Sequence, residues 1–230
     1  MMPEINVHTH KSSASFEKTD EIRLYNLPFP ENRNEATSPC SFPENTFFSA
    51  GLHPLIPEMT FEEEDQIFFQ LEEYLIRKKL LALGECGLDK NSPLSREGQM
   101  NRFRRQILLS EKYSLPLILH NVRMWEEAFF LRKECHAKMP WIAHSFRGSP
   151  QLAKELEKKG IFISFAPVFL EKSSHIDEYS FLSRIFLETD ESDISLSSMY
   201  KILAEKWQME LEDLREKAAR SFKEVFYAGK

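Results

Sequence analysis

Cysteine is scarce in this chain, and long apolar runs are missing. The three cysteines, Cys40, Cys86 and Cys135, lie far apart without a C-x-x-C pair, so the pattern indicates neither a disulfide framework nor a zinc knuckle. A membrane-spanning helix needs roughly 18 consecutive apolar residues, and the sequence contains no such stretch. The first residues, Met-Met-Pro-Glu, have neither the basic nor the apolar segment of a secretion signal. We therefore expect a soluble protein of the cytoplasm, without membrane association.

An excess of positive charge is missing as well. The chain has 30 Lys and Arg against 36 Asp and Glu, a formal net charge of −6, and a sequence pI of about 5.7. This balance argues against a broad electrostatic surface for nucleic acid, although it is compatible with a local one. With 230 residues, 42% of them hydrophobic and 19 of them Phe, the chain can bury a large core.

Short apolar segments alternate with segments of helical character along most of the chain. Strands are predicted for residues 5–10, 22–27, 47–54 (running into a turn), 80–85, 116–120, 141–144, 161–165 and 184–189. Helices are predicted for residues 60–79, 95–114, 124–135, 150–159, 197–208 and 211–227. Thr60 and Glu63 form a capping box, Ser149 and Pro150 begin a helix, and Gly160 ends it.

Apolar strands separated by helices are typical of a parallel sheet that helices cover on both faces. Eight such strands predict a (β/α)8 TIM-like barrel, formed as a single domain by residues 1–230. The intervals 11–21 and 28–45, after the first two strands, have no room for an ordinary covering helix, and the second contains four prolines. We therefore expect the barrel to be distorted or incomplete on that side.

Histidines and acidic residues gather where the predicted strands end. His8 and His10 are two positions apart on the first strand, so their side chains point to the same side. The other members follow the third, fourth, fifth, sixth and eighth strands: His53, Glu85, His120, His144 and Asp190. Active sites of such barrels lie at the C-terminal strand ends. Without His53, this set of four imidazoles and two carboxylates can hold two divalent metal ions about 3.5–4 Å apart, and the two oxygens of Glu85 can bridge them.

The segments that carry these residues resemble the TatD family of metal-dependent hydrolases, within the amidohydrolase superfamily. The resemblance covers nearly the whole chain from residue 5 onward, in residues 6–10 (Asn-Val-His-Thr-His), 50–54 (Ala-Gly-Leu-His-Pro), 84–89 (Gly-Glu-Cys-Gly-Leu-Asp), 116–120, 144–149, 163–165 and 187–190. It implies a TIM-like barrel that acts as a deoxyribonuclease or phosphoesterase. The implied substrate is DNA or a small phosphoester, and the implied cofactors are two divalent ions of Zn, Mg or Mn.

The resemblance also implies a role for each member of the group. One metal ion would be bound by His8, His10 and Asp190. The other would be bound by His120 and His144, with Glu85 bridging the two. Asp190 would also take a proton from the attacking water. No lysine stands at the position of Glu85, which disfavours the branch of the superfamily whose bridging ligand is a carboxylated lysine.

The chain departs from the family pattern in three places. Asn6 stands where the family has Asp, which affects the surroundings of the metal ligands rather than the ligands themselves. Arg123 comes one place later than the arginine that the family has after the fifth strand. The shortened first two units also remove loops that would wall the site. His53, Arg123 and Arg147 are predicted to contact the substrate. The alternatives are a turn residue for His53 and solvated loop charges for the two arginines.

The sequence is also compatible with two other functions. One is a metal-binding scaffold or sensor with lost or weak catalysis, which the three departures motivate. The other is an enzyme of the amidohydrolase type that cleaves an ester, lactone or amide, which the acidic balance favours. The sequence predicts no protein partner.

Overall fold

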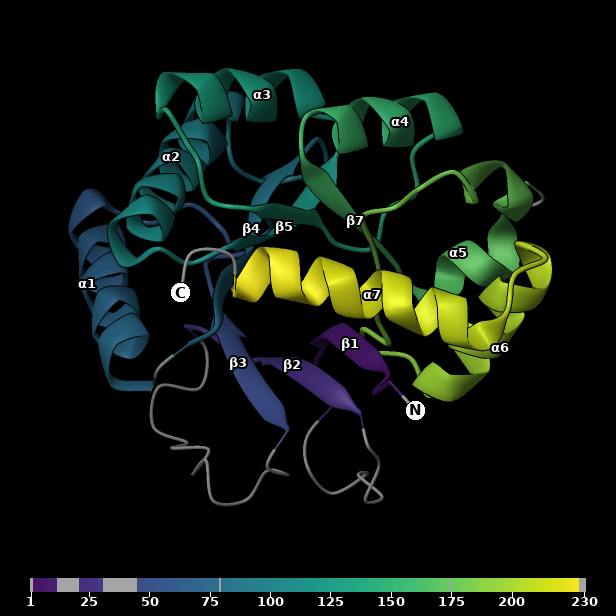
Figure 1. Cartoon of the computed structure of the whole chain (residues 1–230). Coiled ribbons are helices and arrows are strands. Elements are labelled where there is room, and N and C mark those ends of the chain that lie inside the picture. The colour runs from purple at the N-terminus through teal and green to yellow at the C-terminus, as the bar shows by residue number, and fades with distance from the viewer. Residues whose placement is uncertain (1, 12–20, 31–44, 79, 174, 228–230) are drawn as a thin grey trace. The chain divides into compact units, whose positions relative to one another are not determined.

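The computed structural model describes residues 2–11, 21–30, 45–78, 80–173 and 175–227 (Figure 1). Within these residues the strands are β1 Ile5–Thr9, β2 Ile22–Asn26, β3 Thr46–Ala50, β4 Ala82–Asp89, β5 Leu117–Val122, β6 Trp141–Ala143, β7 Ile161–Phe165 and β8 Ile185–Leu187. The helices are α1 Phe61–Lys78, α2 Arg96–Tyr113, α3 Trp125–Glu134, α4 Pro150–Lys158, α5 Pro167–Lys172, α6 Leu196–Lys206 and α7 Leu211–Phe226, with a short 3₁₀ helix, η3, over Ile176–Tyr179. Cys40 and most of the loop expected over residues 28–45 lie outside the described residues. Among the described helices, none is both long enough and apolar enough to cross a lipid bilayer.

The strands are parallel neighbours in the order of the chain. Because β8 also pairs with β1, the eight strands form a closed barrel. The predicted (β/α)8 barrel is confirmed, and its ring of strands is complete. From β3 onward a helix follows each strand, whereas the described residues between β1 and β3 contain no helix. This asymmetry agrees with the two shortened units expected from the sequence.

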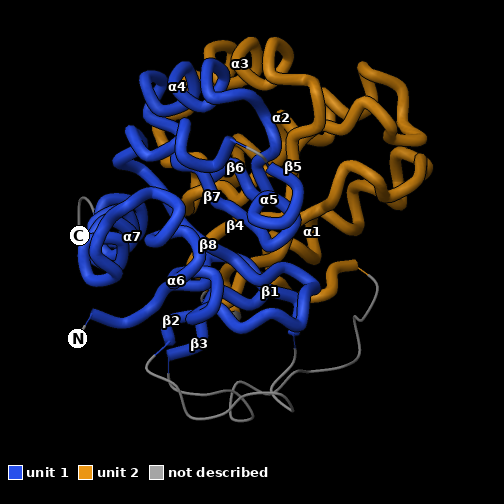
Figure 2. Tube along the Cα trace, turned by 90° about the vertical axis from the view of Figure 1, so that its right-hand side faces the viewer, with its two compact units in different colours: residues 1–25, 37–47, 142–230 blue, residues 26–36, 48–141 orange. Residues whose placement is uncertain are grey.

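Packing divides the chain into two compact units (Figure 2). Unit 1 consists of residues 1–25, 37–47 and 142–230, and unit 2 consists of residues 26–36 and 48–141. The expectation of a single domain therefore remains a prediction, and each unit is described by itself below.

In unit 1, β7 and β8 are buried along their whole lengths. Figure 1 shows α7 running beside β1, and the two elements are in contact. The hydroxyl of Tyr200 on α6 accepts from the main-chain N–H of Ile5 at 3.2 Å. Sequence patterns did not predict α5 and η3, which lie between β7 and β8. The rings of Phe165 and Phe169 stack with centroids 4.2 Å apart, and Tyr179 meets Phe169 edge-on at 5.0 Å, so aromatic packing stabilises this short segment.

In unit 2, α1 begins where its capping signal predicted. The main-chain N–H of Thr60 donates to Glu63 Oε2 at 2.9 Å, and the N–H of Glu63 donates to Thr60 Oγ1 at 3.2 Å. These reciprocal bonds are the expected capping box of α1. Ser95 caps α2 by a single bond, since its Oγ accepts from the N–H of Gly98 at 3.0 Å.

The predicted end of the fourth strand was wrong. β4 runs on through Asp89, and Glu85 lies inside it rather than at its end. Two glycines explain the extension, because they allow β4 to lie unusually close to β5. A Cβ atom on Gly87 would lie 2.2 Å from the carbonyl oxygen of His120, and one on Gly84 would lie 2.6 Å from that of Ile118. Both glycines also have positive φ angles, 136° and 150°, which residues with a Cβ rarely adopt. β5 likewise runs past His120, to Val122.

Candidate metal centre

Among the described residues, each unit carries a cluster of histidines and carboxylates, on or just after its strands. The unit 1 cluster consists of His8, His10, His144, Glu188 and Asp190. The unit 2 cluster consists of His53, Glu85, Asp89 and His120. Within the unit 1 cluster, ligand atoms of His8, His10 and Asp190 all lie within 4.8 Å of one another, as do those of His144, Glu188 and Asp190. Within the unit 2 cluster, the same holds for His53, Glu85 and His120.

The spacing of His8, His10 and Asp190 suits a metal ion. The Nε2 atoms of His8 and His10 lie 3.1 Å apart. Asp190 Oδ1 lies 4.0 Å from the first of these nitrogens and 3.9 Å from the second. Ligand atoms about 2.0–2.1 Å from a tetrahedral zinc ion would be separated by about 3.3 Å, so the three atoms are close to the spacing that one ion requires. We conclude that these donors fit a divalent metal.

Main-chain hydrogen bonds fix Asp190 beside the first strand. Its N–H donates to the carbonyl of His8 at 3.2 Å, and the N–H of His10 donates to the carbonyl of Asp190, also at 3.2 Å. This pairing continues the β1–β8 register past the end of β8. Asp190 has φ 52°, a left-handed conformation that few non-glycine residues adopt and that is enriched at functional sites.

His144 follows β6 and is held by a carboxylate that the sequence did not single out. Its Nδ1 lies 2.7 Å from Glu188 Oε1, and the same oxygen accepts from the N–H of Ser145 at 2.8 Å. Glu188 is fully buried. Burial raises the pKa of Glu188, but the charge and hydrogen bond of His144, the charge of His8 and a hydrogen bond with Ser164 outweigh it and hold the pKa below its ordinary value. A buried, ionised carboxylate behind a histidine fixes the ring orientation and the tautomer that presents Nε2.

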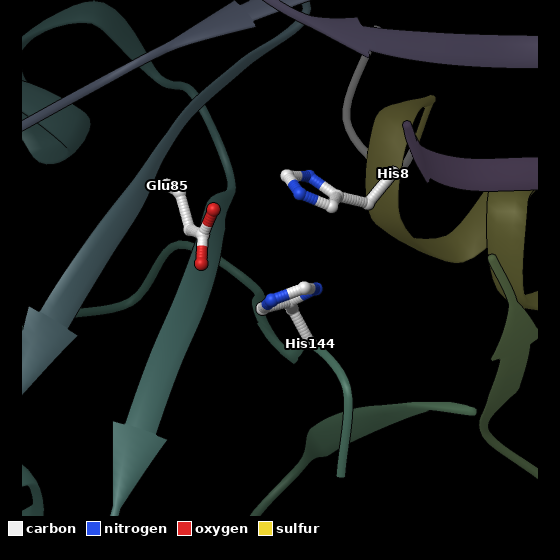
Figure 3. Close-up of side chains that lie close together, drawn as sticks. All are labelled: His8, Glu85 and His144. Carbon is white, nitrogen blue, oxygen red and sulfur yellow. The ribbon is translucent and has the colours of Figure 1, made fainter. Parts of the chain in front are cut away.

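The imidazoles of His8 and His144 come together in unit 1. Figure 3 shows the two rings side by side, and their centroids lie 4.3 Å apart. His8 is completely buried, and His144 nearly so. The structure therefore groups three of the four predicted histidine ligands with Asp190, one of the two predicted carboxylate ligands.

In unit 2, Glu85 and His120 are direct neighbours on adjacent strands. Figure 3 shows the Glu85 side chain leaving β4. Its Oε1 lies 3.0 Å from Nδ1 of His120. The other ring nitrogen, Nε2, lies 2.8 Å from Asp89 Oδ2, and Asp89 Oδ1 accepts from the N–H of Asn91 at 2.7 Å. Burial raises the pKa of Asp89, but these hydrogen bonds from Asn91 and His120 leave it below its ordinary value. Asp89 thus orients His120 so that Nδ1 can bind a metal.

His53 has the geometry of a hydrogen-bond donor. Its Nδ1 accepts from the N–H of Leu55 at 3.1 Å, so the neutral ring carries its proton on Nε2. That atom lies 3.1 Å from Glu85 Oε1. The backbone next to it is fixed by Gln106, whose side chain bonds both the N–H and the carbonyl of Leu52, at 2.8 and 3.0 Å. A nitrogen that holds a proton cannot also bind a metal, which separates His53 from the ligands.

Asn6 ties β1 to the residue before Asp190. Its Nδ2 donates to Thr189 Oγ1 and to Glu21 Oε1, both at 3.0 Å, and its Oδ1 accepts from the N–H of Thr189 at 3.1 Å. These bonds use both the donor and the acceptor of an amide. An aspartate in this position would lack the donor and would face the Glu21 carboxylate with like charge.

The two predicted arginines do not join the clusters. Arg123 is exposed, with φ 57° immediately after β5. Arg147 is also exposed, and its Nη2 lies 3.5 Å from Ser145 Oγ. Their contact with substrate stays a prediction.

Comparisons with known proteins give one consistent result. The model of a family described as "TatD related DNase" matches residues 26–227. An uncharacterised metal-dependent hydrolase, YabD of Bacillus subtilis, is 31% identical over 150 residues, covering 63% of this chain and 58% of that protein. Human deoxyribonuclease TATDN3 is 28% identical over 176 residues, covering 70% of this chain and 62% of that protein. The aligned part of the chain thus spans less than two thirds of the length of these relatives.

Solved structures share the fold. The TatD homologue YjjV of Escherichia coli has a TM-score of 0.76 with 20% sequence identity, and the match covers 97% of both chains. A TatD family hydrolase of Entamoeba histolytica has a TM-score of 0.74 with 15% identity and 99% coverage of both chains. At these identities the likeness supports the barrel alone.

Proposed function

The chain belongs to the TatD-related DNase family, and on that premise we propose that it is a divalent-metal-dependent hydrolase of phosphoester bonds, with DNA as its substrate. The observation that carries the proposal is the set of imidazole and carboxylate atoms that converge at metal-binding distances in each unit. The name of the human relative, a deoxyribonuclease, favours DNA among phosphoesters.

We assign two metal ions to these residues. His8, His10 and Asp190 would hold one ion, and His120 and His144 would hold the other, with Glu85 shared between them. The support is topological, because the C-terminal ends of all strands in a parallel barrel lie at the same end. An imidazole-rich donor set suits zinc better than magnesium or manganese, which prefer oxygen ligands. When bound, such a pair lowers the pKa of water and neutralises charge that develops on the phosphate.

The chain's own residues orient the metal ligands and the substrate, and they accept a proton during the reaction. Asp190 can bind metal through Oδ1 and accept a proton through its other oxygen, because a carboxylate has two acceptor atoms. Glu188 and Asp89 hold His144 and His120 in the required tautomers. His53 presents Nε2–H and can donate it to a phosphate oxygen of the substrate. The exposed Arg123 and Arg147 are the proposed contacts for the remaining phosphate charge.

The test combines metal content with turnover. Purified protein is analysed for metal, and hydrolysis of a generic phosphodiester and of a DNA oligonucleotide is measured before and after chelation. We expect close to two equivalents of metal and activity that disappears on chelation and returns with metal. Asp190→Asn should lose turnover and should weaken binding of the ion that Asp190 would hold together with His8 and His10. Glu191→Gln, which removes a neighbouring exposed carboxylate, is the matched control and should remain active.

Other results would support the alternatives. Metal without turnover on any substrate would indicate a metal-binding scaffold. Turnover of carboxylic esters, lactones or amides but not of phosphodiesters would indicate an enzyme of the amidohydrolase type that cleaves one of those bonds. Failure to bind metal after reloading would contradict the whole ligand assignment.

A further inference from the structure

Unit 2 contains a buried guanidinium, on α2, to which the proposed reaction assigns no role. The side chain of Arg102 is 2% exposed. Its Nη1 donates to the carbonyl of Ile56 at 2.7 Å, and its Nη2 donates to that of Pro57 at 3.2 Å. Nε and Nη2 also donate to Glu64 Oε2, at 3.1 and 2.9 Å. The planar fork of one arginine thus joins α2 both to the first turn of α1 and to the loop before that helix.

The loop that Arg102 holds begins with His53, shortly after β3. We call residues 53–57 the His53 turn. Of these five residues only Pro54 is buried, and Leu55 is 44% exposed. Apolar packing therefore contributes little to fixing the turn, and polar bonds from neighbouring elements take its place. Ser92 supplies one such bond, since its Oγ donates to the carbonyl of Pro54 at 2.6 Å, and Arg102 supplies two.

Two residues one turn apart on α2 hold the chain on both sides of the His53 imidazole. Gln106 bonds the N–H and the carbonyl of Leu52, the residue immediately before His53. Arg102 bonds the two carbonyls at the other end of the His53 turn. Residues four positions apart lie on the same face of a helix, so one face of α2 supports both ends of this segment.

Hydrogen bonds inside the His53 turn carry this support to the imidazole. The N–H of Ile56, whose carbonyl Arg102 binds, donates to the carbonyl of His53 at 3.1 Å. The N–H of Leu55 donates to His53 Nδ1, also at 3.1 Å. This second bond puts the proton of the neutral ring on Nε2, which lies 3.1 Å from Glu85 Oε1. If the turn shifts, the Leu55 N–H leaves Nδ1, and the ring can change its tautomer.

We propose that Arg102 is a positioning residue for His53: it holds the His53 turn so that the imidazole keeps its proton on Nε2 and presents it to a substrate phosphate. The use of that proton rests on the function proposed above, whereas the positioning does not. Stability alone is a poor account of Arg102, because apolar residues of similar volume often replace a buried ion pair without loss. The guanidinium differs from them in binding two carbonyls and a carboxylate in one fixed plane.

The first test observes the His53 ring without turnover. In protein labelled with ¹⁵N at histidine, the ring-nitrogen shifts report the tautomer at about pH 8.5, where free imidazole is neutral, and His53→Gln identifies the His53 signals by their loss. We expect the Nε2–H tautomer in the parent chain. Arg102→Met should give a mixture of tautomers and faster amide hydrogen exchange at Leu55 and Ile56.

Arg105→Met is the matched control for this measurement. Arg105 lies on the same helix, but its ion pairs are with Asp65 and Glu64 rather than with the His53 turn. The tautomer of His53 and the exchange of the two amides should therefore match those of the parent chain.

The second test asks whether Arg102 acts through His53 during turnover. Arg102→Met should lower kcat for a phosphodiester at least about tenfold, as misplacement of a catalytic group does, with KM nearly unchanged. In the His53→Gln background the same change should lower kcat by less than about twofold, because the group that Arg102 positions is gone. Arg102→Lys keeps the buried charge but not the fork. It should show the same changes to a smaller degree, and it replaces Arg102→Met if that variant does not fold.

The outcomes separate this inference from the proposed function. A parent chain that hydrolyses no phosphodiester, with an Arg102→Met variant that changes the His53 tautomer, would contradict the function and support the positioning. An unchanged tautomer in the Arg102 variants, or an equal loss of kcat with and without His53, would overturn the proposal.

Discussion

The two clusters use the same device on opposite ring nitrogens. In the unit 1 cluster, Glu188 lies behind Nδ1 of His144. In the unit 2 cluster, Asp89 lies behind Nε2 of His120. A carboxylate that accepts from one nitrogen of a histidine sets the tautomer in which the other nitrogen binds a metal. Metal binding would therefore use Nε2 of His144 but Nδ1 of His120.

The clusters differ in how deeply the histidine is buried. The side chain of His144 is 4% exposed, whereas that of His120 is 21% exposed. A carboxylate and a histidine that are both removed from water depend on each other for stability, because an unpaired group there loses its solvation. Nearer to water, the loss of a partner is partly compensated by solvent. We infer that Glu188 contributes to folding as well as to metal binding, while Asp89 mainly orients its ligand.

The largest expected effect breaks the more buried pair. Glu188→Ala removes the partner of His144 and the acceptor of the Ser145 N–H. We expect the free energy of unfolding of the metal-free protein to fall by about 3 kcal/mol, the range for breaking a buried pair. Denaturant unfolding measures this difference. Glu191→Ala, an exposed neighbour, should change stability by less than about 0.5 kcal/mol. An unfolding free energy equal to that of the parent would show that Glu188 has no role in folding.

A second variant separates metal binding from stability. Asp89→Asn keeps the shape of the side chain beside His120 but removes its charge. We expect metal affinity at the His120 ligand to fall about 10–100-fold, the usual cost of losing such a partner, with a smaller loss of folding stability than Glu188→Ala causes. Titration with metal followed by elemental analysis should show one of two equivalents lost first. Glu97→Gln on α2, also exposed, is the control. Equal loss of both equivalents of metal would contradict the proposal that Asp89 acts only on the ion bound through His120.

A third variant tests the surroundings of the unit 1 cluster. Asn6→Asp restores the residue expected from the family but places a carboxylate against Glu21 and removes the donor to Thr189. We expect a loss of about 1 kcal/mol in the free energy of unfolding, the value of one buried hydrogen bond. The double variant with Glu21→Gln should recover most of it, which a double-mutant cycle measures. If Asn6→Asp is as stable as the parent, the amide is not specifically required.

Local signals predicted much of this fold because they are complete within a few residues. The capping box of Thr60 and Glu63 and the cap at Ser95 define helix starts without reference to the rest of the chain. The segment with α5 and η3 could not be predicted in the same way. Its helices are short, and packing among Phe165, Phe169 and Tyr179 stabilises them, which sequence patterns do not reveal.

The site shows a similar limit. The sequence identified the candidate ligands from residue type and strand position, but it placed Glu85 at a strand end, whereas β4 continues to Asp89. The close approach of β4 to β5 at Gly87 depends on backbone geometry. Glu188 was missed as the partner of His144 because an acidic residue at the end of an apolar strand can point inward or to solvent. The one available signal was its place directly after the buried run Ile185–Leu187.

The smallest expected effect compares the arginines that follow the two histidines. Arg123 comes after His120 in unit 2, and Arg147 comes after His144 in unit 1, and both are exposed. Neither Arg123→Ala nor Arg147→Ala should change stability, because exposed side chains contribute little. If each contacts phosphate, KM should rise a few-fold with kcat unchanged, the pattern of lost ground-state binding. We expect the larger rise for Arg123, because the guanidinium of Arg147 lies near Ser145 Oγ and would have to leave that contact. Steady-state kinetics on a phosphodiester decides this, and a fall in kcat for either variant would place that arginine at the reacting group instead.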